Sequence, residues 1–236
     1  IGSSILSAFQ EGAIILSGST KDISQAAYFP ANGKYYFIDV GDNIYSTFAI
    51  DTCKDETGDP LSLEHTLSDR LCALADYTLP KPVAYSTKNI MFGTLGGNIE
   101  YYNIDSSTWG TISSATMGGS GPVYTLGVNY SAITVLLDTV IMAVRDEAYH
   151  TGIRINTGGL QSGNWTNPAQ PPAQMTRALK ILHTQGSTWY LLGEFSSQAS
   201  LWVSINDGFI WNSVSVLDLS FLGRDIAYSD SSDTLV

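Results

Sequence analysis

Three carboxylates occupy matching points in the sequence and have the chemistry of an acid–base pair. Asp39, Asp138 and Glu194 each follow a run of strand-forming residues, so each is expected to end a second strand of a repeated unit. Two facing carboxyl groups are the machinery of most glycoside hydrolases, where one is the acid and the other the base or nucleophile. The alternative is that a carboxylate at a strand end serves the following turn and faces solvent. The sequence favours this second interpretation, and Asp225 is a further acidic residue of the same kind.

An aromatic residue among amides forms a second candidate site, suited to sugar binding. Trp165 lies with Gln161, Asn164 and Asn167 in a Gly/Pro/Asn-rich loop that we expect over residues 157–175. An indole can stack on the C–H face of a sugar ring while amides bind its hydroxyl groups. The competing hypothesis is that Trp165 is an apolar plug between neighbouring sheets.

The cysteines and histidines do not indicate a metal site or a catalytic triad. Cys53, His65, Asp69 and Cys72 are close in sequence, but their spacing matches no common zinc module, so we expect neither a metal nor a cofactor. The two cysteines are either bridged or free. None of the three histidines lies in a nucleophile-triad context.

Composition narrows the class of protein. The 236 residues carry a formal net charge of −11, which repels a phosphate backbone and makes nucleic acid an unfavourable partner. Charged residues make up only 14%, against about a quarter in typical globular domains, and Gly and Tyr are abundant. The longest apolar run, residues 132–144, is too short to span a membrane. This profile is typical of β-strands joined by tight turns and is common outside cells. The chain begins at Ile1, so we expect a processed product or an excised piece.

Five segments share one layout, which predicts a repeated β-sheet architecture. Each has a short strand, a polar turn and a second strand rich in aromatic and aliphatic residues; the copies start at residues 26, 83, 123, 178 and 226. Third strands are expected at residues 43–50, 98–104, 139–144 and 199–205, and fourth strands at 108–113, 148–155 and 209–216. The copies recur 40 to 57 residues apart, which fits four-stranded propeller blades with insertions. An irregular β-sandwich is the alternative.

The ends of the chain complete this prediction. The fifth copy stops after two strands, and two further strand-like runs stand at residues 4–9 and 13–18. We therefore predict a single all-β domain over residues 1–236: a five-bladed β-propeller of four-stranded antiparallel blades, closed by the N- and C-terminal strands. One helical insertion is expected over about 59–76, because Leu63, Leu67, Leu71 and Leu74 recur at helical spacing after Asp59 and Pro60.

One hairpin carries a family resemblance. The stretch "SINDGFIW", residues 204–211, resembles the Asp-box of sialidase-type propellers, Ser-x-Asp-x-Gly-x-Thr-Trp, at Ser204, Gly208 and Trp211. It departs from that motif at Asn206 and Ile210, and "DSSTWGTIS" from Asp105 is a weaker echo without the glycine. The resemblance covers about a tenth of the chain. It implies a propeller with structural turns and does not carry over sialidase activity, because no arginine lies in the sialidase context.

These observations predict a non-enzymatic binding module. We expect a propeller on an extracellular or virion protein, contacting a surface glycan or a protein; in composition the chain resembles phage tail and spike modules. The alternatives are a glycosidase that uses the strand-end carboxylates and a purely architectural assembly subunit.

Overall fold

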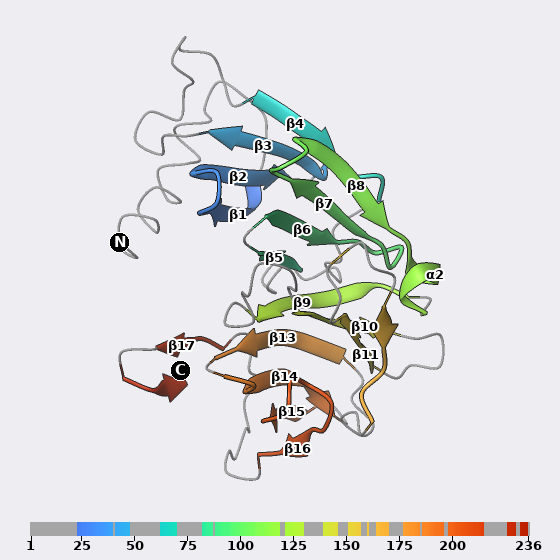
Figure 1. Cartoon of the computed structure of the whole chain (residues 1–236), viewed down its shortest axis with the longest axis vertical. Coiled ribbons are helices and arrows are strands. Elements are labelled where there is room, and N and C mark those ends of the chain that lie inside the picture. The colour runs from blue at the N-terminus through green and yellow to red at the C-terminus, as the bar shows by residue number, and fades with distance from the viewer. Residues whose placement is uncertain are drawn as a thin grey trace. The chain divides into compact units, whose positions relative to one another are not determined.

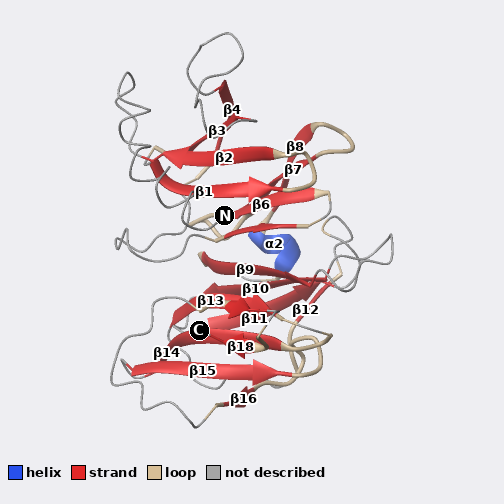
Figure 2. Cartoon of the chain, turned by 90° about the vertical axis from the view of Figure 1, so that its left-hand side faces the viewer, coloured by secondary structure: helices blue, strands red, loops and turns tan. Residues whose placement is uncertain are grey.

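The structure is a computed structural model in which the described residues form an almost entirely β protein. It describes residues 23–39, 41–47, 62–69, 82–86, 88–118, 121–129, 139–145, 151–156, 160, 164–169, 177–184, 186–195, 198–214, 226–229 and 232–235. The chain divides into two compact units, Ile1–Arg70 and Leu71–Val236. Strands dominate both units (Figure 2).

The first unit contains one four-stranded antiparallel sheet in the order β1-β2-β3-β4. Its strands are β1 (Ile23–Phe29), β2 (Lys34–Asp39), β3 (Asn43–Thr47) and β4 (Ser62–Thr66). One face of the sheet has a buried apolar centre, with Phe29, Tyr36, Ile38 and Ile44 at most 1% exposed. Side chains alternate between faces along each strand, so Tyr28 and Tyr35 belong to the opposite face.

The helix predicted over residues 59–76 is wrong where the structure describes it. Ser62–Thr66 is a strand, β4, which pairs antiparallel with β3. Glu64 of this strand receives hydrogen bonds from Lys34 and Ser46, so contacts with β2 and β3 fix the extended conformation. These tertiary contacts override the helical spacing of the leucines, and Leu63 is left exposed while Leu67 is buried. The remainder of the predicted helix, residues 59–61 and 70–76, lies outside the described residues.

The described residues of the second unit form three four-stranded antiparallel sheets and a hairpin (Figure 1). The first of these sheets is β5 (Val83–Tyr85), β6 (Asn89–Gly93), β7 (Ile99–Asn103) and β8 (Thr108–Ile112). The second is β9 (Val123–Asn129), β10 (Thr139–Arg145), β11 (Thr151–Asn156) and β12 (Trp165–Thr166). The third is β13 (Arg177–His183), β14 (Trp189–Phe195), β15 (Gln198–Ser204) and β16 (Asn212–Ser213), and the hairpin is β17 (Tyr228–Ser229) with β18 (Thr234–Leu235). A one-turn helix, α2 (Ser114–Met117), connects β8 to β9.

The sheets of the second unit pack face to face through three apolar clusters. One cluster joins the β5–β8 sheet to β9 and β12, and another joins β9 and β11 to the β13–β16 sheet. In the third cluster, Ile226 and Leu235 of the hairpin region pack against Leu192 of β14 and its neighbours. The first strands of successive sheets approach closely: the backbone N–H of Ile181 donates to Thr125 Oγ1 at 3.1 Å. The hairpin therefore continues the same sheet-on-sheet series.

Most strands of the predicted repeat are confirmed, but the third copy is displaced by one strand. The run at 139–144 was expected as a third strand, whereas β10 pairs with β9 and is the second. The predicted fourth strand accordingly becomes the third, β11, and the fourth is β12, within the predicted loop 157–175. Hydrophobic runs alone do not reveal which neighbour a strand pairs with. The N-terminal strands at residues 4–18 lie outside the described residues, so closure of a ring stays a prediction.

Candidate functional site

Asp39 is committed to the turn that follows β2. Its Oδ1 accepts hydrogen bonds from the backbone N–H groups of Gly41 at 2.8 Å and Asn43 at 2.9 Å. Its Oδ2 accepts from Asn43 Nδ2 at 3.0 Å and from the Tyr45 hydroxyl at 3.2 Å. The carboxylate is 6% exposed. Both oxygens thus hold the β2–β3 turn, as the structural alternative predicted, but the residue is buried and does not face solvent as that alternative expected.

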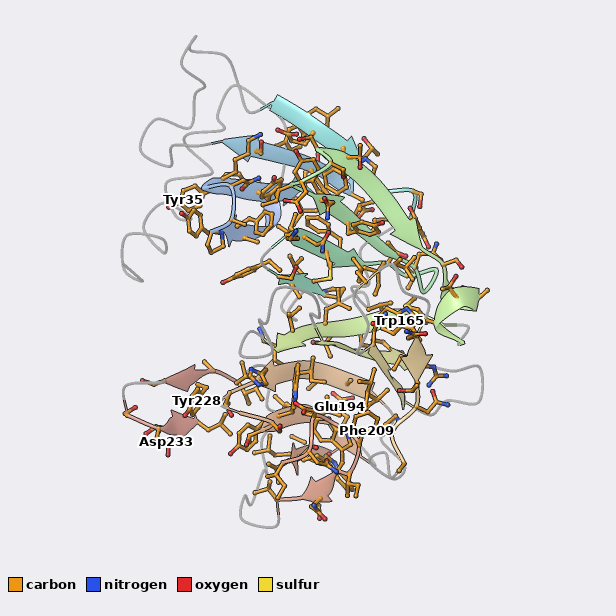
Figure 3. All side chains as sticks on the ribbon, viewed as in Figure 1. Tyr35, Trp165, Glu194, Phe209, Tyr228 and Asp233 are labelled. Atoms are coloured by element: carbon orange, nitrogen blue, oxygen red, sulfur yellow. The ribbon has the colours of Figure 1, made fainter. Side chains whose placement is uncertain are left out.

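The other predicted carboxylates do not share one placement. Glu194 lies on β14, half-buried, with Arg177 and Ala199 as its cross-strand neighbours (Figure 3). Asp138 was expected to end the second strand of its copy, but that strand is β10 and begins at Thr139. The expectation that the second strand of this copy precedes Asp138 is therefore wrong. Asp138 itself lies outside the described residues, as does Asp225, so their placement stays a prediction.

Trp165 is not an exposed loop tip. It begins β12, opposite Asn156 of β11, and its half-buried indole packs against the cluster formed with the β5–β8 sheet (Figure 3). The indole Nε1 is buried and has no hydrogen-bond partner among the described residues. Asn164 and Asn167 beside it are exposed, whereas Gln161 lies outside the described residues. The position of Trp165 is that of a plug between sheets, the competing hypothesis from the sequence.

The turn between β15 and β16 is closed by its own side chains. Ser204, fully buried, accepts a hydrogen bond from Gly208 N at 3.0 Å and donates to Asn206 Oδ1 at 2.8 Å. Asn206 Oδ1 also accepts from Ile210 N at 2.9 Å, and Trp211 Nε1 donates to Gly208 O at 2.6 Å. The Trp211 indole is 4% exposed within the cluster between the β9–β12 and β13–β16 sheets. As predicted, this stretch lies between the third and fourth strands of a sheet.

The equivalent turn between β7 and β8 is polar and exposed. Asn103 Oδ1 accepts hydrogen bonds from both the backbone and the hydroxyl of Ser106, at 3.0 and 3.1 Å. Ser107 adopts a positive φ of 53° in place of a glycine. Trp109 is half-buried and contacts Phe92 and Tyr102 of its own sheet, with ring centroids 5.8 and 5.5 Å apart.

An ion pair that sequence reasoning missed joins three strands of the first sheet. Lys34 Nζ lies 2.9 Å from Glu64 Oε1, and the Ser46 hydroxyl donates to the same oxygen. Burial acts to raise the pKa of Glu64, but the hydrogen bonds from Ser46 and Lys34 and the Lys34 charge outweigh it and lower the pKa below its usual value. A carboxylate held ionised in this way is a poor proton acceptor, so the cluster is better suited to stability than to catalysis.

An exposed pair of tyrosines was also missed. Tyr28 of β1 and Tyr35 of β2 are directly opposite each other, with ring centroids 4.7 Å apart and planes tilted by 39°. Tyr28 is 42% exposed and Tyr35 is partly exposed. Their placement is symmetric about the turn at residues 30–33, and this symmetry was the available sequence signal.

Neither a metal-ligand cluster nor a membrane-spanning helix is present in the described part of the chain. No group of three His, Cys, Asp or Glu residues there is placed to hold a metal ion. Cys53 and Cys72 lie outside the described residues, so whether they are bridged is untested. Within the same residues no helix has the length and apolar character needed to cross a bilayer.

Comparisons with known proteins show the fold and nothing finer. No family model matches the chain, and no curated protein matches it in sequence. The WD40 domain of coronin from Toxoplasma gondii superposes with a TM-score of 0.60 at 8% identity, over 92% of this chain and 52% of that one. YCF48 from Cyanidioschyzon merolae gives 0.59 at 12% identity, over 90% and 62%. The WD40 repeats of RRP9 give 0.53 at 9% identity, over 83% and 52%.

The chain therefore has a repeated β-propeller fold. It spans about half to three-fifths of the length of these propeller chains. At 8 to 12% identity, their activities and partners carry no information about this protein.

Proposed function

We propose that this protein is a non-enzymatic recognition module of the propeller type. It is displayed on an extracellular or virion surface, in the manner of phage tail and spike modules, and contacts a surface glycan or a protein. The low charge content and the abundance of Gly and Tyr support this location. The propeller fold supports the function, because such folds present turns and loops from a rigid scaffold.

One observation carries the non-enzymatic part of the proposal: the use of Asp39 as a turn cap. A glycosidase carboxylate must reach a substrate or its water molecule with a free oxygen. Both oxygens of Asp39 instead accept hydrogen bonds from the residues of its own turn, and the group is almost completely buried. Asp39 is therefore unsuited to either role of an acid–base pair, whereas Glu194 is half-buried, and Asp138 lies outside the described residues.

The finer architecture that we propose is a five-bladed ring. The hairpin β17–β18 packs on the β13–β16 sheet as the next member of the series, and residues 4–9 and 13–18 supply its missing strands. The turn at 204–211 supports an Asp-box-like character, because its serine, glycine and indole match the motif and close the turn. In this interpretation Asn206 Oδ1 takes the place of the carboxylate in the motif.

The test is to assay wild-type protein for both activities. We expect no turnover of a panel of chromogenic α- and β-glycosides, and saturable binding on an array of cell-surface glycans and candidate protein partners. Turnover that Glu194→Gln abolishes would support a glycosidase and overturn the proposal. Absence of binding to any glycan or protein, together with incorporation into a larger particle, would favour an architectural subunit.

A further inference from the structure

The exposed tyrosine pair of the first sheet stands on a rigid turn. Gly33 N donates to Phe29 O at 3.0 Å, Lys34 N to Asn32 Oδ1 at 3.1 Å, and Asn32 Nδ2 to the Tyr36 hydroxyl at 2.8 Å. These bonds fix the hairpin that connects β1 to β2. Tyr28 and Tyr35 flank this turn at the end of the sheet, and Tyr35 projects from the ribbon there (Figure 3). A ligand would therefore meet a preformed surface and lose little binding free energy to ordering it.

As far as the described residues form it, this surface is aromatic, hydroxylic and uncharged. The two rings lie against each other, and within the described residues neither phenol hydroxyl forms a hydrogen bond. The nearest charged residue in sequence, Lys34, points to the opposite face, where it pairs with Glu64. The chain as a whole carries a formal charge of −11. The net charge therefore disfavours sialylated and sulfated glycans.

We infer that Tyr28 and Tyr35 form a stacking platform for a neutral sugar ring of a surface glycan. The weakly polarised C–H face of a pyranose packs on an aromatic ring, and the phenol hydroxyls exchange hydrogen bonds with the sugar hydroxyls. The inference rests on the proposed recognition function and moves the glycan contact from Trp165, whose indole is committed to sheet packing, to the first sheet.

The experiment uses the full chain and soluble neutral hexasaccharides of glucose, mannose and galactose as probes. Saturation-transfer NMR identifies the sugar that binds, and isothermal titration calorimetry measures its affinity. Tyr28→Ala and Tyr35→Ala are each expected to weaken binding about tenfold, the effect of losing roughly 1.4 kcal/mol of contact. Tyr28→Phe keeps the ring and is expected to retain most of the affinity.

The matched control is Tyr228→Ala, which removes a tyrosine from the hairpin β17–β18, where its hydroxyl donates to Asp233 at 2.6 Å (Figure 3). This variant is expected to bind as wild type does. Far-UV circular dichroism of every variant checks that the fold is retained. If an alanine variant fails to fold, Tyr28→Leu and Tyr35→Leu replace it, because leucine keeps an apolar side chain and removes the ring; each is expected to weaken binding, and binding that survives both overturns the inference.

Two outcomes overturn the inference. One is the absence of binding to any neutral hexasaccharide; the other is binding that survives both alanine substitutions. Sedimentation velocity is run in parallel, and a dimer dissociated by Tyr28→Ala without sugar binding identifies a self-association surface instead. If wild type binds only charged glycans or a protein, the platform is overturned and the recognition function stands. Hydrolysis of the probes overturns the function itself.

Discussion

The β7–β8 and β15–β16 turns occupy the same position in their sheets, and each is followed by a tryptophan, yet the two indoles reach different surroundings. Trp211 is buried in the cluster between two sheets, and its Nε1 bonds to the turn itself. Trp109 is half-buried and contacts the rings of Phe92 and Tyr102 in its own sheet. A Trp after a third-strand turn is therefore insufficient to predict a wedge between sheets.

The difference begins in the backbone of the turns. Asp207 and Gly208 both have positive φ, 55° and 82°, whereas the other turn has a single such residue, Ser107. Two consecutive left-handed residues reverse the chain tightly. The backbone then brings Gly208 O within reach of Trp211 Nε1, and the buried Ser204 hydroxyl closes the loop. The glycine and the serine of the turn therefore determine whether the indole is buried between two sheets.

The largest expected effect is a difference in stability between alanine variants of the two tryptophans. Trp211→Ala leaves a cavity between sheets and is expected to lower the free energy of unfolding by about 3–5 kcal/mol, whereas Trp109→Ala should lower it by about half as much or less. Urea unfolding followed by far-UV circular dichroism measures both. Equal losses would show that Trp109 is also a wedge and would remove the distinction drawn between the turns.

The next effect tests the buried hydroxyl. Ser204→Ala leaves Gly208 N without its acceptor in a buried site and is expected to cost about 1–3 kcal/mol of stability. Ser106→Ala changes an exposed hydroxyl of the other turn and should stay within about 0.5 kcal/mol of wild type. The same unfolding assay compares them. A neutral Ser204→Ala would mean that water replaces the hydroxyl without loss.

A smaller effect on stability is expected from changing the residues that have positive φ in the two turns. Gly208→Ala places a Cβ at a φ of 82° and is expected to cost about 1–2 kcal/mol. Ser107→Gly relieves a residue already at positive φ but adds unfolded-state freedom, so it should change stability by about 0.5 kcal/mol or less. Melting temperatures of the two variants provide the measurement. If Gly208→Ala is tolerated like Ser107→Gly, the paired left-handed residues do not determine the turn.

The smallest effect on stability is expected at two ion pairs, Lys88–Asp105 near the exposed turn and Lys34–Glu64 in the first sheet. Because the pKa of Glu64 is lowered by folding, its contribution is present above the ordinary value of 4.5 and is lost as the pH falls through the folded-state pKa. Lys88 and Asp105 pair at the surface, where solvent screens them, so Asp105→Asn should change stability by less than about 0.5 kcal/mol.

Unfolding midpoints between pH 7 and pH 3 measure this contrast. Glu64→Gln is expected to flatten the acid-side loss of stability, and Asp105→Asn is expected to leave it as in wild type. An unchanged acid limb in Glu64→Gln would contradict a stabilising role for the Lys34–Glu64 pair.

Local sequence signals predicted the strands and turns of this protein better than they predicted the partners of each segment. The hairpins around residues 30–33 and 204–211 follow from short-range chemistry, and both are present as expected. The helix expected at 59–76 and the strand order of the third copy were wrong, because each depends on a neighbour distant in sequence. β4 is extended owing to β3 and Lys34, and β10 is a second strand because β9 lies beside it.

The candidate site shows the same limit. The sequence identified Trp165 as the sugar-binding aromatic from its polar neighbours, but the adjacent sheet buries part of its indole. It identified Asp39 as a possible catalytic group, but both carboxylate oxygens accept hydrogen bonds that hold the β2–β3 turn. The burial of a side chain and the number of hydrogen bonds it forms depend on all the residues around it in space. Many of these residues are distant in sequence, so a short stretch of sequence does not reveal them.

The sequence by itself determined that this chain forms a series of short antiparallel strands, because strand propensity and turn chemistry are properties of adjacent residues. Only the tertiary structure decided which strands form each sheet, which tryptophans are buried between sheets, and which aromatic residues stay at the surface. Those outcomes depend on contacts between segments far apart in the chain, where packing free energy outweighs local preference.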